Sequence, residues 1–534
     1  MRESQAATGQ NVFWRKTIWW LLALFLVSVA LRIPNLSRPL SKHHEFCTAL
    51  TLIIVEAWAD EGIAANDFNP STTFSLPADK FINNCSMDTM QHNGNFYYLS
   101  HPPLAYYVPY AIFKISGIAP SPLALQPLNL FFEFITIVFV YLITSLILKN
   151  DHQKSISIPA LIAAAIYLFL PVTLWFHSNA YMADMFVQNM WAPALFISLK
   201  IFMERKEKSV NWLIAFAVSI FLMTYTDWLG ALFSATVFLS AAFYVIRRKE
   251  KSFIPLTIIT AVVPVFTVLL VLFQYASING WGTLIYCYTQ RYAERGSLNW
   301  NHFSNLMSVL SQVGFNYLVS YAPVLPLLVV FIFRWKAVSD KFPDLKLFIW
   351  LTLVPVLLDH FLFLRYAVQD FGVLKASFLL SIIGAVALCT LASLRSRHLL
   401  GREKQSPEIA GDCFGLHPRN DGVVWGLLPA VVICIAGIAI YYYINRPGEV
   451  SFSGDRYDAE QKIGLFIREH AKQDEVVFLQ GADVSPQIVY YAHRNIKEVR
   501  SEADAKNFLL LHPADRGIII QVKKDTLTSI PLSE

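Results

Sequence analysis

Apolar residues gather into eleven long runs along the chain, and the polar residues lie mainly between these runs. A membrane helix needs about 20 mostly apolar residues to cross a hydrocarbon core of about 30 Å. The runs therefore predict an all-α polytopic membrane protein with about eleven transmembrane helices. They cover residues 17–33, 124–148, 156–176, 185–203, 211–226, 228–246, 253–275, 312–333, 345–363, 371–394 and 423–444.

The composition agrees with a chain that lies mostly in lipid. Of the 534 residues, 55% are hydrophobic and 15% are charged, and the mean hydropathy is +0.45. Soluble domains carry about 25% charged residues. The composition excludes a soluble enzyme, a disordered chain and a nucleic-acid-binding protein with a basic surface. We expect membrane lipids among its partners and no nucleic acid.

Basic side chains occupy every second loop between the runs, and the positive-inside rule places such loops in the cytoplasm together with the N-terminus. The apolar segment 103–118 would reverse this order if it crossed, so we interpret it as an interfacial or re-entrant helix. The basic residues are Lys149, Lys154, Arg205, Lys206, Lys208, Arg247, Arg248, Lys249, Lys251, Arg334, Lys336, Lys341, Lys346, Arg395, Arg397, Arg402 and Lys404. The loops expected to face outward are 35–123, 177–184, 226–228, 276–311 and 364–370.

The last part of the chain differs from the rest because it is rich in charge. DAEQKIGLFIREHA and SEADAKNFLLLH have helical spacing, and EVVFLQG and GIIIQV are typical of short buried strands. We therefore predict two domains. Residues 1–444 form the transmembrane domain with its long first outer loop, 35–123, and residues 445–534 form a small extracytoplasmic α/β domain.

Polar residues suited to chemistry concentrate at the two ends of the first outer loop. Glu45 follows His43 and His44 near its beginning, and the motif His-Pro-Pro-Leu starts at His101 near its end. A carboxylate beside imidazoles just above the hydrocarbon suits a general base, because desolvation raises the pKa of a carboxyl group toward neutrality. The alternative is a helix start at which the dipole favours an acidic residue.

The pattern as a whole resembles the GT-C glycosyltransferases, in the branch that holds protein O-mannosyltransferases and lipid A aminoarabinose transferases. The shared features are a first span ending in Arg-x-Pro, at Arg32, an acidic motif that opens a long outer loop, and His-Pro-Pro-Leu before an interfacial helix. The number of spans and the outer C-terminal domain also fit. The resemblance implies an inverting enzyme that moves a sugar from a polyprenyl-phosphate carrier to an acceptor on the outer face.

The resemblance also implies catalytic residues. Many members read Asp-Glu in the first motif, and alignment on Ala49 puts His44 at the Asp and Glu45 at the Glu. We predict that Glu45 deprotonates the acceptor hydroxyl with His44 tuning it, although the base can also come from elsewhere. Asp184, at the mouth of the fourth run, is the second predicted catalytic carboxylate, and its alternative is a helix N-cap. Asp227 is interpreted as a turn residue.

The carrier phosphate needs cations on the outer side, and arginine suits this role because its guanidinium makes bidentate contacts. We predict Arg291 and Arg365 as phosphate ligands, with anchoring to lipid headgroups as the alternative. Arg295, four residues after Arg291, is interpreted as structural. The other predicted substrate contacts are His43, His101, which orients the phosphate or caps the interfacial helix, Tyr366, and Asp370, which would hydrogen-bond the sugar.

No cofactor is predicted beyond the lipid-linked sugar donor. His43, His44, Glu45 and His92 are metal-ligand types, but their spacing matches no zinc motif. The similar branch generally works without a metal, so no metal site is predicted and a divalent cation stays an open alternative. The sequence has no P-loop, which argues against a nucleotide-sugar donor bound in that way.

Two other classes of membrane protein compete with this interpretation. A lipid-linked glycan ligase or polymerase usually carries its large loop late in the chain. A lipid or sugar transporter places polar groups at the membrane midplane and often shows repeated halves. The resemblance favours a bacterial inner membrane with the active side and the C-terminal domain in the periplasm. The acceptor stays open among glycolipid, polysaccharide and protein.

Two cysteines, Cys47 and Cys85, lie in the first outer loop, where disulfides can form. A bridge between them and two buried free thiols are both compatible with the sequence.

Overall fold

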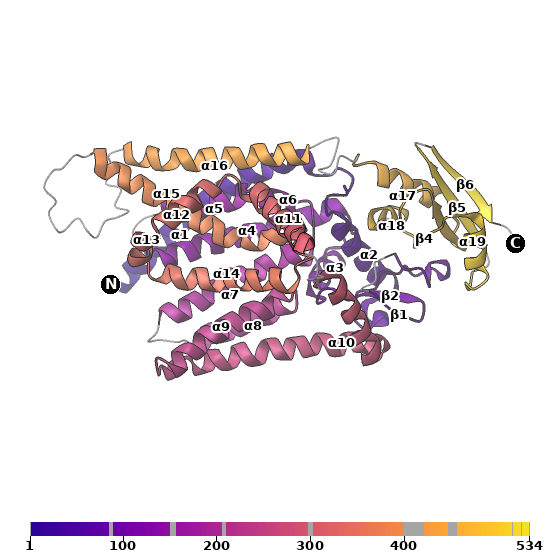
Figure 1. Cartoon of the computed structure of the whole chain (residues 1–534), viewed down its shortest axis with the longest axis horizontal. Coiled ribbons are helices and arrows are strands. Elements are labelled where there is room, and N and C mark those ends of the chain that lie inside the picture. The colour runs from indigo at the N-terminus through magenta and orange to yellow at the C-terminus, as the bar shows by residue number, and fades with distance from the viewer. Residues whose placement is uncertain are drawn as a thin grey trace.

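Helices dominate the computed structural model of the chain (Figure 1). The structure describes all residues except 1, 85–88, 150–155, 205–209, 297–302, 400–420, 447–455, 515, 525, 533 and 534. In Figure 1 a bundle of long, roughly parallel helices makes up most of the molecule, and a small sheet domain lies beyond one end of the bundle.

Each of the predicted apolar runs is helical, which confirms the polytopic helical fold. Among the described residues, eight helical segments have the length and composition of membrane spans, and α11 (Phe303–Tyr321) and α12 (Leu325–Phe333) make a further one that bends by 97°. Two shorter apolar helices, α5 (Ile158–Phe169) and α8 (Val210–Thr224), occupy the remaining runs. The long helices are α1 (Arg2–Arg32), α4 (Pro122–Ile147), α7 (Ala183–Met203), α9 (Leu229–Ile246), α10 (Ile254–Arg295), α14 (Asp344–Leu362), α15 (Ser377–Leu399) and α16 (Asp421–Asn445). The short helices α6 (Pro171–Phe176) and α13 (Trp335–Lys341) complete the bundle.

Most of the described part of the segment 276–311, predicted as an outer loop, is helical, and its outward position stays a prediction. Helix α10 continues to Arg295 across a kink at Asn279 and Gly280, where Gly280 has a φ of 80° that favours glycine. After the kink, Leu284 and Cys287 are buried in one cluster with Met90, Tyr97 and Leu99 of the first outer loop. The polar stretch around Asn279 hides this amphipathic continuation in the sequence.

The first outer loop is itself folded. It contains α2 (Phe46–Glu61), the hairpin of β1 (Thr89–His92) with β2 (Asn95–Tyr98), and α3 (Leu104–Ser116). Helix α3 begins within the His-Pro-Pro-Leu motif, occupies the segment predicted as an interfacial helix, and is too short to be counted among the spans. Cys47 has no disulfide partner among the described residues, and Cys85 lies outside them, so a bridge between the two stays a prediction.

The C-terminal region forms a small α/β unit, as the sequence predicts. Strand β3 is parallel to both of its neighbours, and β6 runs antiparallel to β5, in the order β4-β3-β5-β6. The unit packs on the first outer loop, where the Nε of Arg494 donates to Asp79 Oδ1 at 3.0 Å and the Nδ2 of Asn495 donates to the Ile82 carbonyl. Its elements are α17 (Ala459–His470), β3 (Glu475–Gln480), α18 (Pro486–Ala492), β4 (Ile496–Glu498), α19 (Glu502–Leu509), β5 (Arg516–Lys523) and β6 (Thr526–Leu532).

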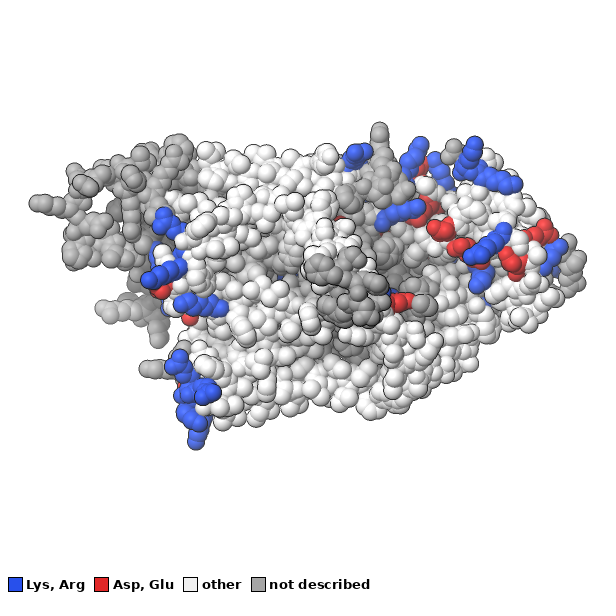
Figure 2. Space-filling view, in the orientation of Figure 1, with Lys and Arg blue, Asp and Glu red and all other residues white. Residues whose placement is uncertain are grey.

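Charge is distributed unevenly over the surface. Lysine and arginine side chains gather at the end of the bundle that lies opposite the C-terminal unit, and the face between the two ends is nearly free of charge (Figure 2). We expect this arrangement if every second loop is basic and lies at one end of the bundle, while the remaining loops lie at the end that carries the C-terminal unit. Which end faces the cytoplasm stays a prediction.

Candidate active site

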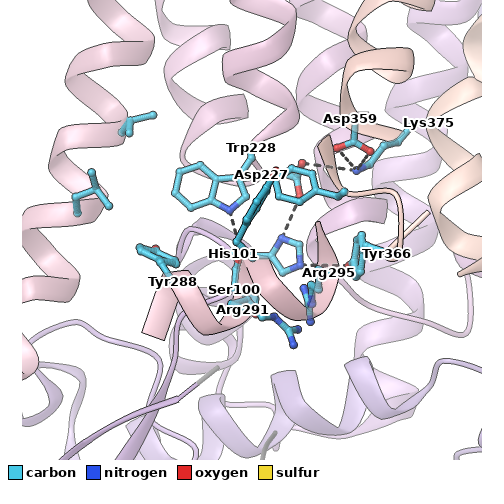
Figure 3. Close-up of a pocket in the computed structure, with 14 residues that line it drawn as sticks. Ser100, His101, Asp227, Trp228, Tyr288, Arg291, Arg295, Asp359, Tyr366 and Lys375 are labelled. Atoms are coloured by element: carbon cyan, nitrogen blue, oxygen red, sulfur yellow. Dashed lines mark hydrogen bonds and ion pairs between the residues drawn. The ribbon is translucent and has the colours of Figure 1, made fainter. Parts of the chain in front are cut away.

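Two cavities meet where the first outer loop joins the helical bundle. One cavity of about 320 Å³ has several apolar walls, among them Val268 and Leu272 of α10, and the other, of about 370 Å³, is lined by polar groups such as Asp184 and Arg365. The residues common to both are His101, Arg291, Arg295 and Tyr366 (Figure 3). We call the first the apolar cavity, the second the polar cavity, and these four residues the shared wall.

His101 occupies the centre of the shared wall. Its Nδ1 lies 3.0 Å from Asp227 Oδ2, and its Nε2 lies 3.5 Å from the Tyr366 hydroxyl, as Figure 3 shows. The backbone is held as well, because the Tyr275 hydroxyl donates to the His101 carbonyl. The two prolines that follow His101 end this extended segment before α3 begins. The imidazole is therefore held on one side by a carboxylate and points its other nitrogen toward the cavities.

A buried lysine connects three aspartates behind the shared wall. Lys375 Nζ donates to both carboxylate oxygens of Asp359 at 2.9 Å and lies 3.1 Å from Asp184 Oδ1. It lies 4.0 Å from Asp227 Oδ1. Lys375 is 2% exposed, so its single positive charge, held away from water, offsets part of the negative charge of the three carboxylates.

Asp184 begins α7 and faces the polar cavity. Its Oδ2 accepts a hydrogen bond from the Tyr366 hydroxyl at 2.9 Å, and His101 Nε2 lies 3.8 Å away. Among the residues that line the polar cavity, Asp184 thus stands next to the shared wall. Its alternative interpretation as a side-chain N-cap has no support, because α7 begins after Met182 without a side-chain cap hydrogen bond.

Three arginines face these cavities. Arg291 and Arg295 belong to the last part of α10, and both belong to the shared wall. The Nε of Arg291 donates to Ser100 Oγ at 3.1 Å, and the Arg295 guanidinium lies 4.6 Å from the centre of the Tyr366 ring. Arg365 lines the polar cavity only. The positive charge at the shared wall therefore comes from α10.

Glu45 has a different environment. Its Oε2 accepts hydrogen bonds from Arg38 at 2.7 Å and from the backbone amide of Ser41 at 2.6 Å, and the residue is 1% exposed. The guanidinium of Arg38 lies 4.0 Å from the centre of the Tyr457 ring, which belongs to the C-terminal region. Glu45 lines neither of the two cavities. Its predicted role as base stays a prediction.

The neighbouring histidines contact Asp370. His43 Nε2 lies 2.7 Å from Asp370 Oδ2, and His44 Nε2 lies 2.7 Å from Asp370 Oδ1. His43 also stacks on Trp175, and its Nδ1 lies 3.1 Å from Asn445 Oδ1. The structure therefore brings Asp370 to the adjacent His43 and His44, which are far from it in the sequence, and none of the three lines the polar cavity.

Two groups of side chains offer three ligand atoms within 4.8 Å of one another, which is the spacing that a metal ion needs. His43, His44 and Asp370 supply two imidazole nitrogens and a carboxylate oxygen, which are suitable ligand types. In the group of His101, Asp184 and Asp227, the ammonium of Lys375 already lies 3.1 Å from Asp184, and its positive charge opposes a second cation. The second group is therefore the less suited of the two to a divalent ion.

Comparisons with protein-family models and with curated proteins find no match. Solved structures do match over nearly the whole chain. The oligosaccharyltransferase AglB from Archaeoglobus fulgidus, in complex with an inhibitory peptide and a dolichol-phosphate, has a TM-score of 0.59 at 13% identity, covering 96% of this chain and 69% of its own. The chain has the GT-C fold.

Two structures of ArnT from Cupriavidus metallidurans agree with this fold. The apo form has a TM-score of 0.55 at 11% identity, covering 94% of this chain and 92% of its own. The form bound to undecaprenyl phosphate has a TM-score of 0.51 at 13% identity, covering 94% and 93%. At these identities the likeness concerns the fold, and the GT-C architecture expected from the sequence is confirmed.

Sequence reasoning missed part of the charge network. It left Lys375 and Asp359 unmentioned and interpreted Asp227 as a turn residue, although all three meet behind the shared wall. One signal was available, because Asp359 and Lys375 are charged residues within long apolar runs, where an ionisable residue is costly. Arg295 was interpreted as structural, although it lines both cavities.

Proposed function

We propose that this protein is an inverting glycosyltransferase that moves a sugar from a polyprenyl-phosphate carrier to an acceptor on the outer face of the membrane. The observation that carries the proposal is the shared wall, where two arginines and a histidine stand between an apolar and a polar cavity. A lipid-linked sugar has the matching order of parts, an apolar chain, a phosphate and a polar sugar.

In this proposal the apolar cavity holds the first part of the prenyl chain, between Trp228 and the α10 residues Val268 and Leu272. The phosphate lies at the shared wall, where Arg291 and Arg295 supply the charge-assisted hydrogen bonds that phosphate oxygens favour. The sugar and the acceptor hydroxyl then lie in the polar cavity. Arg365 and Tyr366 line this cavity and are in a position to contact them.

The transfer requires one base and one stabilised leaving group. We propose that Asp184 takes the proton of the acceptor hydroxyl while the acceptor oxygen attacks the anomeric carbon from the side opposite the phosphate. The bond between the anomeric carbon and the phosphate oxygen breaks, and its electron pair leaves with the polyprenyl phosphate. Arg291, Arg295 and His101 stabilise the charge that develops there. Lys375 and Tyr366 fix the orientation of the Asp184 carboxylate.

The most direct test of this function is binding of undecaprenyl phosphate to the purified full-length protein, measured by native mass spectrometry. Arg295→Gln should weaken binding by about tenfold or more, because a charged partner of a phosphate is lost. Arg247→Gln provides the control, because Arg247 is an exposed arginine just after α9 and lines neither cavity. Failure of the native protein to bind, or equal binding by both variants, would contradict the proposal.

The setting follows from the same proposal. A carrier-dependent transferase of this kind fits a bacterial inner membrane, with the cavities and the C-terminal unit in the periplasm and the basic loops in the cytoplasm. Cysteine labelling from the outside of intact spheroplasts should modify a cysteine introduced at exposed Asp474 and leave one introduced at exposed Arg247 unmodified.

A further inference from the structure

A third cavity lies where the C-terminal unit faces the start of the first outer loop. It has a volume of about 840 Å³, and we call it the outer groove. Its walls come from the beginning of α17, from the segment that joins β3 to α18, and from the beginning of α2. The residues are Lys42, Phe46, Arg456, Ala459, Glu460, Ile463, Gly481, Ala482, Asp483, Val484, Ser485, Pro486, Gln487 and Ile488.

The outer groove lies at the carboxyl end of a parallel strand. Strand β3 ends at Gln480, and the chain then passes through α18 to β4. Strand β4 lies on one side of β3, and β5 lies on the other side of β3. Open α/β sheets bind ligands at this kind of point, where successive connections leave in opposite directions. Gly481 makes the exit possible, because it has a φ of 87° and a Cβ there would lie 2.4 Å from the Val522 carbonyl oxygen.

One polar residue of the groove wall has an unsatisfied side-chain oxygen. Gln487 is 2% exposed, and its Nε2 donates to the Ser41 carbonyl at 2.8 Å. Its Oε1 is buried and has no hydrogen-bond partner among the described residues. A buried acceptor without a partner costs free energy, and a ligand hydroxyl that donates to it removes that cost.

The charges of the groove oppose one another. Lys42 and Arg456 are basic, and Glu460 and Asp483 are acidic, so the formal charges of the wall cancel. A wall of this composition offers both donors and acceptors without attracting a strongly anionic or cationic ligand. None of the lining residues belongs to a strand, so the groove lacks the free strand edge on which extended peptides are commonly bound.

Phe46 connects this groove with the reaction centre. It is 36% exposed and lines both the outer groove and the polar cavity that contains Asp184. An exposed aromatic ring between two polar cavities provides an apolar face for a sugar ring. A ligand that reaches from the groove past Phe46 would bring one of its hydroxyl groups toward Asp184.

We propose that the outer groove binds the saccharide part of the acceptor, an uncharged chain of sugar units whose terminal hydroxyl enters the polar cavity. This inference rests on the proposed function and names the acceptor class that this function requires. The hydroxyl groups of such a chain both donate and accept, which matches Gln487, Asp483 and Lys42.

The test uses the full-length protein in lipid nanodiscs on an array of immobilised neutral oligosaccharides built from hexose and N-acetylhexosamine units. Ala459→Trp places a bulky ring in the groove wall from an exposed position at the start of α17. Ala503→Trp is the matched control, because Ala503 is exposed near the start of α19 and does not line the groove. We expect native protein and Ala503→Trp to bind the same oligosaccharides and Ala459→Trp to bind them at least about tenfold more weakly.

Two further arms separate the outcomes. Absence of oligosaccharide binding by the native protein, or equal binding by Ala459→Trp, overturns the inference. Binding of immobilised peptides or of lipid A vesicles that is lost in Ala459→Trp overturns the saccharide class in favour of the class that binds. Undecaprenyl phosphate binding, measured in parallel, should be unchanged in both tryptophan variants, and its absence in native protein would contradict the proposed function instead.

Discussion

Glu45 and Asp184 are both acidic residues at the mouth of a helix on the same side of the bundle, yet their surroundings differ. Glu45 is enclosed by Arg38 and the Ser41 amide, where the first outer loop meets the C-terminal region. Asp184 lines a cavity and lies beside His101. The two residues occupy similar positions in the sequence, and only their partners in the structure distinguish a carboxylate enclosed by the loop from one that lines a cavity.

The largest effect is expected for Asp184, the carboxylate that lines the polar cavity. Asp184→Asn keeps the size of the side chain and removes the charge that accepts a proton, so turnover should fall by about 100-fold or more. Binding of undecaprenyl phosphate should stay close to native, because the arginines of the shared wall are unchanged. A transfer assay with lipid-linked sugar and envelope acceptor measures the first quantity, and Asp474→Asn, an exposed change, serves as the control.

Glu45→Gln tests whether Glu45 stabilises the fold rather than acting as the base. The change leaves the buried Arg38 without its charged partner, which should lower the free energy of unfolding by about 3 kcal/mol. Turnover of the folded fraction should stay within about tenfold of native. Thermal unfolding and the transfer assay decide together. A native melting temperature with a collapse in turnover equal to that of Asp184→Asn would restore Glu45 as the base predicted from the sequence.

An intermediate effect is expected in the apolar cavity, which in our proposal holds the prenyl chain of the carrier. Leu272→Trp fills part of that cavity, so the KM for lipid-linked donor should rise by about tenfold while turnover changes less. Leu270→Trp is the matched control, because Leu270 is exposed on the other side of α10. An equal rise in KM in both variants would mean that the carrier does not use this cavity.

The smallest effect is expected at the contact between the C-terminal unit and α2. His493 Nδ1 lies 3.1 Å from Glu56 Oε2, and this hydrogen bond raises the pKa of His493 above its usual value, while partial burial of the imidazole opposes the rise. A raised histidine pKa stabilises the folded protein fully below about pH 6.5, and the gain is lost as pH rises through the folded value. The change should be less than about 1 kcal/mol because the pair is partly exposed.

Thermal unfolding as a function of pH measures this contribution. The melting temperature of the native protein should fall slightly from pH 6 toward higher pH. His493→Gln should remove this part of the pH dependence, and His470→Gln, an exposed change on α17, should keep it. Identical pH profiles for native protein and His493→Gln would show that the contact between α18 and α2 does not depend on this charge.

Much of the fold follows from the sequence because hydrophobic runs report burial in lipid directly. The eleven runs are helical, a helix occupies most of 103–118, and the two predicted strands of the C-terminal unit are present as β3 and β5. The continuation of α10 to Arg295 is not predictable from hydropathy, because it is stabilised by packing on the first outer loop. Its consequence for the site is large, since it carries Arg291 and Arg295 into the shared wall.

The sequence allowed single site residues to be predicted, but not their arrangement in space. His101, Asp184, Arg291 and Tyr366 could be named from motifs, position and residue type, and the structure brings them together. The contacts of Lys375 with three aspartates join segments that are far apart in the chain, so no local pattern reveals them. The enclosure of Glu45 by Arg38 also depends on how the loop folds back after the first span.

The central claim is that the carrier phosphate lies at the shared wall, between the two cavities and next to Asp184. Electron cryo-microscopy of the protein in nanodiscs with bound undecaprenyl phosphate tests it most directly. The account predicts phosphate density within hydrogen-bond distance of Arg291, Arg295 and His101, with the prenyl chain following Leu272. Phosphate density beside His43, His44 and Asp370, or at Arg365 away from α10, would contradict it.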